Sequence, residues 1–169
     1  MDERQGRFER LIEEHRGILY TVCRSYCADR NEREDLGQEI VAQLWRSFER
    51  YDDRYAFSTW MYRVALNVAI SYRRRMRRHT EHMLFDDAAI DAAVQQEPQN
   101  ADDLTALRSF IEELDPLPKA LMLLYLEGYP HREIAETLGI SESNVGTKIN
   151  RIKSELRCRF DQQLREDRL

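Results

Sequence analysis

The amino-acid sequence predicts an all-α protein made of two small helical domains that are joined by a flexible acidic linker. Glycine and proline number only six and four among 169 residues, which is too few for a β-rich or low-complexity chain. Apolar residues recur every three or four positions through long stretches rich in Leu, Glu, Arg, Gln and Ala, as in amphipathic helices. With 42% apolar residues, the chain can bury a core without disulfides.

The N-terminal domain is expected over residues 1–78 and begins with two helices. Apolar positions recur at helical spacing from about 4 to 27, which predicts the first helix. The segment "NERE" offers Asn31 as N-cap with Glu34 three residues later, a capping-box pattern for a second helix that runs to about residue 48. The expected buried stripe of this second helix is Leu36, Ile40, Leu44, Trp45 and Phe48.

A third helix is expected after the polar loop "ERYDDRYAF", with Ser58 as its N-cap. It comprises "STWMYRVALNVAISYRRRMRR" and completes the first domain. Its expected inner face is Met61, Val64, Ala65, Val68 and Tyr72.

The linker is expected over residues 79–101, which lack strong periodicity, are rich in Ala, Asp and Gln, and contain Pro98. The second domain then spans 102–169. Four short helices are predicted there, with breaks at "DPLP" and before "HREIAETLG".

The last two helices have the spacing of a helix-turn-helix, with a turn at Gly139 and a new helix that starts at Ser141. The apolar stripe of the final helix is Val145, Ile149, Ile152 and Leu156. Its opposite face carries Ser143, Asn144, Thr147, Lys148 and Arg151. In a helix-turn-helix such side chains can read base edges and hold phosphates in the major groove. The alternative is an ordinary corner of two helices with a solvated face.

The distribution of charge favours nucleic acid more than the net charge of -5 does. Residues 63–82 hold six arginines against one glutamate, and residues 148–159 hold five basic residues against one glutamate. Residues 83–115 hold nine acidic residues against one arginine. The chain therefore has two basic regions separated by an acidic middle.

Aromatic residues lie just before the first basic region. Bases of unpaired DNA stack on rings while phosphates follow positive charge, so this combination suits single-stranded DNA. Tyr51, Tyr55 and Phe57, in or beside the polar loop, are expected to be available for such stacking. For Trp45 and Phe48, packing in the core is the preferred interpretation.

Several other classes of protein fit the sequence poorly. No run of about 18 apolar residues exists to span a bilayer, and the N-terminus "MDERQGRFERLIEEHRG" is charged, so a cytoplasmic protein is expected. An odd count of three cysteines suits a reducing compartment. His15, Cys23 and Cys27 match no common four-ligand zinc site, so neither a metal nor another cofactor is expected.

Three segments, taken in order, resemble conserved regions two and four of bacterial sigma factors of the extracytoplasmic-function type. They are "REDLGQEIVAQLWRSFERYD", "FSTWMYRVALNVAISYRRR" and "LPKALMLLYLEGYPHREIAETLGISESNVGTKINRIKSEL". The resemblance covers roughly residues 5–78 and 102–160. It implies a promoter-specificity subunit of RNA polymerase and not an enzyme, with core polymerase, promoter DNA and an anti-sigma factor as partners.

The resemblance also implies roles for individual residues. Contact with polymerase, at the clamp helices of its largest subunit, is implied for Asp35, Leu36, Gln38, Glu39 and Trp45. Opening and reading of the minus-ten element is implied for Asp53, Arg54, Tyr55, Phe57, Trp60, Arg63, Asn67, Arg73, Arg74 and Arg75. Reading of the minus-thirty-five element is implied for Ser143, Asn144, Thr147, Lys148 and Arg151. Region four is also implied to contact the second-largest polymerase subunit.

The sequence departs from the family pattern at several positions. Leu66 stands where arginine or lysine is common, and Ser71 where aspartate is frequent. Pro130 replaces a capping serine before the helix-turn-helix, and Gly146 lies inside the recognition helix.

Two other functions remain as alternatives. A stand-alone helix-turn-helix regulator normally needs a ligand-binding or dimerisation domain, and none is left over here. A nucleic-acid enzyme needs clustered carboxylates or a metal site, whereas the acidic pairs of this chain lie in loops or at helix starts.

Overall fold

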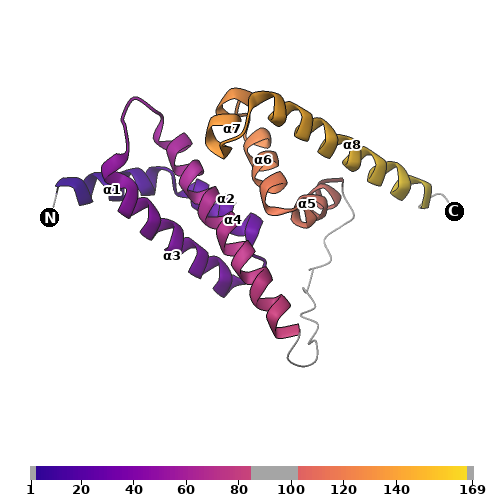
Figure 1. The fold of residues 1–169 in the computed structure, drawn as a ribbon, viewed down its shortest axis with the longest axis horizontal. Helices are drawn as coiled ribbons and strands as arrows, with labels where there is room; N and C mark the ends of the chain where they lie inside the picture. The colour runs from indigo at the N-terminus through magenta and orange to yellow at the C-terminus, as the bar shows by residue number, and fades with distance from the viewer. Residues whose placement is uncertain (1–2, 85–102, 167–169) are drawn as a thin grey trace. The chain divides into compact units, whose positions relative to one another are not determined.

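The computed structural model describes residues 3–84 and 103–166, and every regular element among them is helical. This confirms the predicted all-α fold. The chain divides into two compact units, Met1–Gln96 (unit 1) and Glu97–Leu169 (unit 2), whose helices are labelled in Figure 1. The third predicted helix continues to Leu84, into the range expected as linker, and residues 85–101 of that linker lie outside the described residues.

Unit 1 has a core of three helices that pack on one another, and the N-terminal helix packs on this core. Its elements are α1 (Glu3–Glu14), α2 (Arg16–Tyr26), α3 (Arg30–Ser47), the short 3-10 helix η1 (Phe48–Arg50) and α4 (Phe57–Leu84). Figure 1 shows α3 and α4 side by side, and α2, α3 and α4 share the core. The fully buried side chains of this core include Val22, Leu36, Ile40, Leu44, Met61, Ala65 and Leu66. Helix α1 lies against the end of α3, where the ring of Phe8 is 5.1 Å from those of Trp45 and Phe48.

The expected single helix over residues 4–27 is wrong, because the chain bends at His15 between α1 and α2. His15 has φ -108° and ψ 17°, outside helical geometry. Its ring packs against Phe57 at 5.2 Å, and its Nδ1 lies 3.0 Å from the carbonyl oxygen of Leu11. The bend lets α1 and α2 pack on different parts of the unit while both keep helical periodicity.

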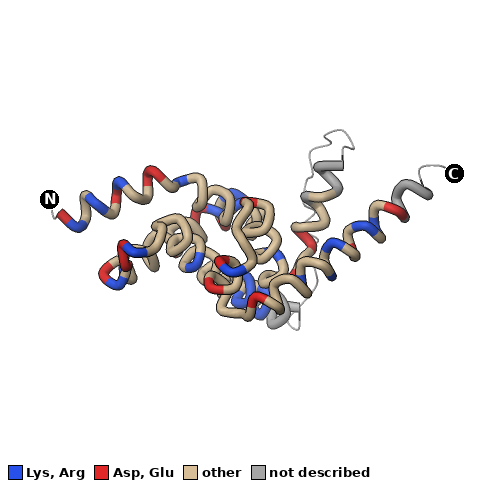
Figure 2. The backbone as a smooth tube through the Cα atoms, turned by 90° about the horizontal axis from the view of Figure 1, so that it is seen from above, with Lys and Arg blue, Asp and Glu red and all other residues tan. Residues whose placement is uncertain are grey.

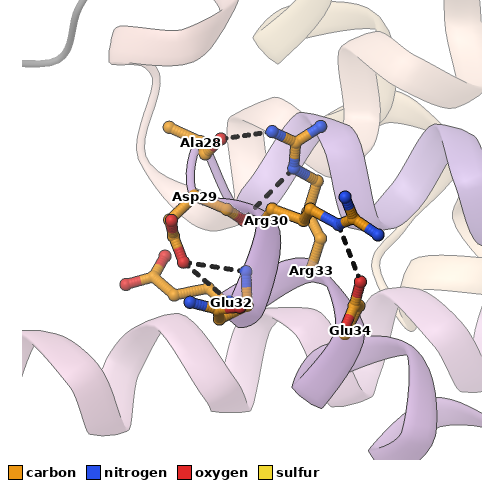
Figure 3. Close-up of polar contacts among 7 residues, drawn as sticks. Ala28, Asp29, Arg30, Glu32, Arg33 and Glu34 are labelled. Carbon is orange, nitrogen blue, oxygen red and sulfur yellow. Dashed lines mark hydrogen bonds and ion pairs between the residues drawn. The ribbon is translucent and has the colours of Figure 1, made fainter.

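Helix α3 begins two residues earlier than expected. Asp29, not Asn31, is the N-cap: its carboxylate accepts hydrogen bonds from the backbone N–H groups of Asn31 at 2.8 Å and Glu32 at 3.1 Å (Figure 3). These bonds, above all the one from Glu32, lower the pKa of the Asp29 carboxyl. Arg33 also donates to the carbonyl oxygens of Ala28 and Asp29. Aspartate and asparagine are both favourable N-caps, and the carboxylate of Asp29 also carries a charge that interacts with the positive end of the helix dipole.

The start of α4 also differs from the expected one. The helix begins at Phe57, and the N–H of Trp60 bonds to the carbonyl of Ala56 at 3.2 Å. Ser58 therefore lies inside the first turn, and its assignment as N-cap is wrong. Of the expected inner face, Met61, Ala65 and Tyr72 are buried, whereas the two valines are half-buried.

Unit 2 contains the predicted helix-turn-helix. Its elements are α5 (Asp103–Glu113), α6 (Pro116–Leu126), α7 (His131–Leu138) and α8 (Glu142–Glu166). Gly139 ends α7 in the left-handed conformation with φ 68°, and Ser141 caps α8 by accepting a hydrogen bond from the N–H of Asn144 at 3.2 Å. The turn and the helix start are thus confirmed. The core includes Leu121, Leu124, Ile134, Val145, Ile149 and Ile152, and Leu156 is half-buried.

A buried lysine closes one helix end in unit 2. The ammonium group of Lys119 donates to the carbonyl oxygen of Glu112, in the last turn of α5, at 2.8 Å. A cation is favourable at this negative end of the helix. Among the described residues, no helix has the length and apolar character needed to cross a bilayer.

Candidate nucleic-acid interface

Four rings gather where the loop between η1 and α4 meets the core of unit 1. Phe57 lies at their centre, with its ring 5.3 Å from those of Tyr51 and Trp60 and only 6% of its surface exposed. The expectation that Phe57 is available for stacking is therefore wrong, because α4 begins at this residue and turns its ring towards Phe48 and His15. Tyr51 and Trp60 are half-buried.

Tyr55 differs from its aromatic neighbours. It is 62% exposed, and its carbonyl accepts a hydrogen bond from the Tyr51 hydroxyl at 2.8 Å. This bond fixes the backbone beside Tyr55 while the ring faces solvent. Among the predicted stacking residues, Tyr55 is thus the one with a freely accessible face.

The acidic residues of the loop are paired with arginines. Arg54 donates to Asp52 through its backbone N–H at 3.0 Å and through its guanidinium at 2.8 Å, and this lowers the pKa of the Asp52 carboxyl. Asp53 forms an ion pair with Arg7 of α1. The sequence gives no signal of this second pair, because its partners are 46 residues apart.

Helix α4 presents one polar, cationic face to solvent. Arg63, Asn67 and Arg74 are exposed at helical spacing on this face, with Trp60 at its start. Arg73 is exposed as well. Leu66, where the family pattern often has a cation, is 1% exposed and belongs to the core. The arrangement offers guanidinium groups and an amide along some three turns of helix.

Arg75 and Glu39, for which the sequence implies different partners, bind each other. The guanidinium of Arg75 donates to both carboxylate oxygens of Glu39, at 3.0 and 2.7 Å, and lies 5.6 Å from the ring centre of Tyr72. This bidentate pair links α3 to α4. Both side chains remain partly exposed.

The predicted polymerase-binding residues of α3 are only partly at the surface. Asp35 and Gln38 are exposed. Leu36 is fully buried. The expected contact of its side chain with polymerase is therefore wrong, and Leu36 packs in the core of unit 1 instead. Trp45 is half-buried beneath the guanidinium of Arg4, 4.7 Å from the ring centre.

A groove of about 830 Å³ lies beside these residues in unit 1. Helices α1, α2 and α3 line it with Gln5, Phe8, Glu9, Leu19, Gly37, Gln38, Val41, Ala42 and Trp45. The sequence assigned only Gln38 and Trp45 to this surface. The contribution of α1 follows from the bend at His15, which the periodicity does not reveal.

The recognition face of α8 has the predicted composition. Ser143, Asn144, Thr147 and Arg151 are exposed and Lys148 is half-buried. Local bonds order this face: Thr147 donates to the carbonyl of Ser143 at 3.0 Å, and Arg151 to Glu155 at 3.0 Å. Figure 2 shows Lys and Arg recurring along α8. The face can therefore offer hydrogen-bonding groups first and cations later along the helix.

The sequence analysis also singled out two cysteines of unit 1 and a glycine inside α8. Cys23 and Cys27 are buried, and burial, with the negative charge of Glu32 as a second cause, raises the pKa of Cys27 to about 11. A thiol that stays protonated is a poor metal ligand, and the described part of the chain brings together no set of three His, Cys, Asp or Glu residues suited to a metal ion. A Cβ at Gly146 would lie 3.8 Å from the His131 ring, which is ordinary contact.

Comparisons with known proteins agree with this geometry. Residues 11–79 match the family model of sigma-70 region 2, and residues 104–156 match that of sigma-70 region 4. The sequence is 28% identical, over 95% of this chain and 86% of the relative, to the ECF RNA polymerase sigma factor SigX of Bacillus subtilis. It is 26% identical to the ECF RNA polymerase sigma factor SigE of Mycolicibacterium smegmatis, over 89% of this chain but only 60% of that relative.

Two solved structures share the fold. The sigma factor RpoE in complex with the anti-sigma factor NepR from Bartonella quintana has a TM-score of 0.69 at 16% identity, over 89% of this chain and 94% of that one. The structure of CnrH in complex with the cytosolic domain of CnrY has a TM-score of 0.65 at 22% identity, over 94% of this chain and 90% of that one.

Proposed function

Because the chain belongs to the extracytoplasmic-function group of RNA polymerase sigma factors, we propose that it binds core RNA polymerase and directs transcription initiation at a specific set of promoters. The observation that carries this proposal is the presence of both sigma regions, in order, on one chain, each with an exposed polar and cationic helix face. A sigma factor is an initiation factor and not an enzyme, and its place of action is the cytoplasm.

Unit 1 would open and read the minus-ten element. Tyr55 offers an exposed ring for an unstacked base, and Asn67 offers an amide on the same unit. Arg63, Arg73 and Arg74 would follow the phosphates of the separated strand, as exposed cations do in other single-strand binding proteins. Phe57 would support the site from within, and Arg75 would contribute only when released from Glu39.

Unit 2 would read the minus-thirty-five element as duplex DNA. Ser143, Asn144 and Thr147 lie in the first turns of α8, where a recognition helix meets base edges. Lys148 and Arg151 follow one turn later and would hold phosphates or a guanine edge. The opposite stripe of α8 is buried, so this face is the one left for DNA.

The exposed face of α3 would meet the clamp helices of the largest polymerase subunit. Asp35 and Gln38 supply an acidic and amide-bearing surface that complements a basic partner. Trp45 lines the adjacent groove and would add apolar contact. Region four would meet the second-largest subunit.

An anti-sigma factor is a further proposed partner. Both solved neighbours are complexes with a second protein, which is an anti-sigma factor in one case. A protein that covers the α3 face or the α8 face of this chain would block its binding to polymerase or to DNA. Co-purification of the endogenous chain, with mass spectrometry of the proteins that accompany it, would identify such a protein.

The decisive experiment reconstitutes the chain with core polymerase and transcribes fragmented genomic DNA, with the 5′ ends of the transcripts mapped by sequencing. We expect tight binding to core polymerase, starts at a small set of related promoters, and weak duplex binding by the chain alone, because its net charge is -5. Asp35→Arg tests the polymerase-binding face, because Asp35 is exposed. A change at Glu39 is less suitable, since it would also break the ion pair with Arg75. Tight sequence-specific DNA binding without polymerase association would support a stand-alone helix-turn-helix regulator instead.

A further inference from the structure

Helix α1 reaches across unit 1 and binds the loop that carries Tyr55. Arg4 forms an ion pair with Glu49 of η1, and Arg7 forms one with Asp53 of the loop. Both arginines also lie over aromatic rings: Arg4 is 4.7 Å from the ring centre of Trp45 in α3, and Arg7 is 5.8 Å from that of Phe48 in η1. Figure 2 shows the alternation of acidic and basic residues along α1.

Three residues of α1 make these contacts from one side of the helix. Residues 4, 7 and 8 lie on the same face of a helix. Phe8 is 7% exposed and packs edge-on against Trp45 and Phe48 at 5.1 Å. This buried ring fixes α1 against Trp45 and Phe48. The guanidinium groups of Arg4 and Arg7, on the same face of α1, are therefore held near their partners Glu49 and Asp53.

The loop needs such support because much of its own bonding is internal. The Tyr51 hydroxyl bonds to Tyr55, and Arg54 bonds to Asp52, so these contacts shape the loop without joining it to another helix. Asp53 is joined to α1 through Arg7. This pair bridges residues 46 positions apart and ties the loop to a helix that packs on the core.

The pairs also change the charge that the loop presents. Glu49 of η1 and Asp52 and Asp53 of the loop are three carboxylates that precede Tyr55 within a few residues. Each is paired with an arginine, two of them from α1. Without the α1 arginines, Glu49 and Asp53 would lose these partners, and the segment around Tyr55 would present more negative charge to the phosphates of promoter DNA.

We propose that Arg4 and Arg7 are positioning residues that latch the loop of residues 51–56 to α1 and so present Tyr55 in one orientation for promoter opening. The role in promoter opening rests on the function proposed above, whereas the latch itself is a property of the free protein. Neither arginine needs to touch DNA, and neither needs to touch polymerase.

Amide hydrogen exchange of the free protein tests the latch. Arg4→Met with Arg7→Met keeps much of the apolar stem of each side chain and removes both cations. Because exposed ion pairs contribute little individually, we expect exchange of the amides of residues 51–56 to rise by roughly two- to tenfold, with α2 and α3 unchanged. The matched control is Arg10→Met, on the same helix, where the exposed guanidinium donates to the Gly6 carbonyl within α1, at 3.3 Å.

The exchange arm has three outcomes that decide the latch. Restored protection in the charge-swapped pair Arg7→Asp with Asp53→Arg supports direct pairing. Unchanged exchange of residues 51–56 in the double methionine variant overturns the latch. Faster exchange throughout α2 and α3 also overturns it, since the arginines would then stabilise the whole unit.

Promoter opening tests the consequence with the full chain bound to core polymerase. At concentrations that saturate core polymerase, we expect the double methionine variant to form open complexes severalfold more slowly on duplex promoter and to recover on a template with a pre-opened bubble. If amide exchange of residues 51–56 rises but the rate of open-complex formation does not change, the positioning role of Arg4 and Arg7 is overturned. Failure of the wild-type chain to initiate at all would instead contradict the proposed function, while the exchange result would still decide the latch.

Discussion

The two proposed DNA-reading regions of this chain are built in different ways. The loop and α4 of unit 1 depend on contacts between distant parts of the sequence: the packing of the Phe57 ring on His15, and the ion pair of Asp53 with Arg7. The face of α8 in unit 2 depends on bonds within its own helix, as between Thr147 and Ser143 or Arg151 and Glu155. The first is an assembled site and the second is a property of one amphipathic helix.

This difference matches what each region would bind. A duplex presents a regular groove, so a straight helix with a polar face suffices to enter it. An unstacked base has no fixed position, and its capture requires an accessible ring held by its surroundings. Mutations that disturb packing should therefore affect the two regions differently.

The largest effect is expected for Ile149→Asp in unit 2. Ile149 is 2% exposed, so the change buries a charge without a partner and should cost about 4 kcal/mol or more, which is enough to unfold this unit. Arg151→Ala, two residues away on the exposed face, should change the stability by no more than about 0.5 kcal/mol. Two-dimensional NMR during thermal unfolding measures the two units separately. Simultaneous loss of the signals of unit 1 would show that the effect of the change is not confined to unit 2.

A second large effect separates two rings of the loop. Phe57→Ala should destabilise unit 1 by about 3 to 5 kcal/mol, because it empties the centre of the ring cluster, whereas Tyr55→Ala should leave stability within about 0.5 kcal/mol. On promoters the order should reverse at permissive temperature, with Tyr55→Ala impairing opening on duplex template. Chemical denaturation and open-complex assays measure the two effects. Equal destabilisation by both changes would place Tyr55 in the core.

The sequence was sufficient to predict unit 2 because its determinants are local. The left-handed turn at Gly139, the cap at Ser141 and the buried stripe that includes Val145 and Ile149 all follow from spacing within a few residues. The uncapped start of α7 at Pro130 was also evident. Each of these features depends on backbone geometry that one short segment sets for itself.

Unit 1 was predicted less completely because long-range contacts override local signals there. Phe57 follows a polar loop in the sequence, yet it is buried and its ring packs against His15, Phe48 and Tyr51, which lie in three other segments. His15 interrupts a helix whose periodicity continues on both sides. Arg75 and Glu39 looked like surface charges with separate roles, and only the packing of α3 on α4 reveals that they form a pair.

A smaller effect should distinguish recognition from stability on α8. Lys148→Ala and Arg151→Ala should each weaken promoter use by about 1 to 3 kcal/mol if the side chain reads a base edge, with little change in unfolding temperature. Run-off transcription over a salt series measures this. If a side chain only holds a phosphate, the loss should be similar on all promoters and the salt slope should fall by about one. Loss of stability equal to the loss of promoter use would contradict the assignment of faces.

Gly146→Ala should produce a gain in stability of about 1 kcal/mol, since glycine is that much poorer than alanine within a helix. The added methyl would meet the His131 ring at 3.8 Å, a distance at which no atom needs to move. Thermal unfolding of unit 2 measures the gain. A stabilised variant that no longer uses its promoter would show that close approach to the DNA backbone, and not packing within the protein, requires this glycine.

The smallest effect concerns the caps of the two units, because only one of them titrates. The Asp29 carboxylate caps α3, and hydrogen bonds from backbone N–H groups lower its pKa, whereas the Ser141 hydroxyl caps α8 and carries no charge. A carboxyl whose pKa is lower in the folded state stabilises the fold above its unfolded pKa, near 4, and this contribution is lost as the pH falls through the folded value.

Asp29→Asn supplies the control for this titration, since asparagine is an equally good N-cap without a charge. Between pH 6 and pH 3 the melting temperature of unit 1 should fall by a few degrees more in the wild-type chain than in Asp29→Asn. Ser141→Asp should introduce a similar acid sensitivity into unit 2, because a carboxylate would then occupy the same position at a helix N-terminus. Identical pH profiles for the wild-type chain and Asp29→Asn would show that other carboxylates, such as that of Asp52 beside Arg54, carry the acid sensitivity of unit 1.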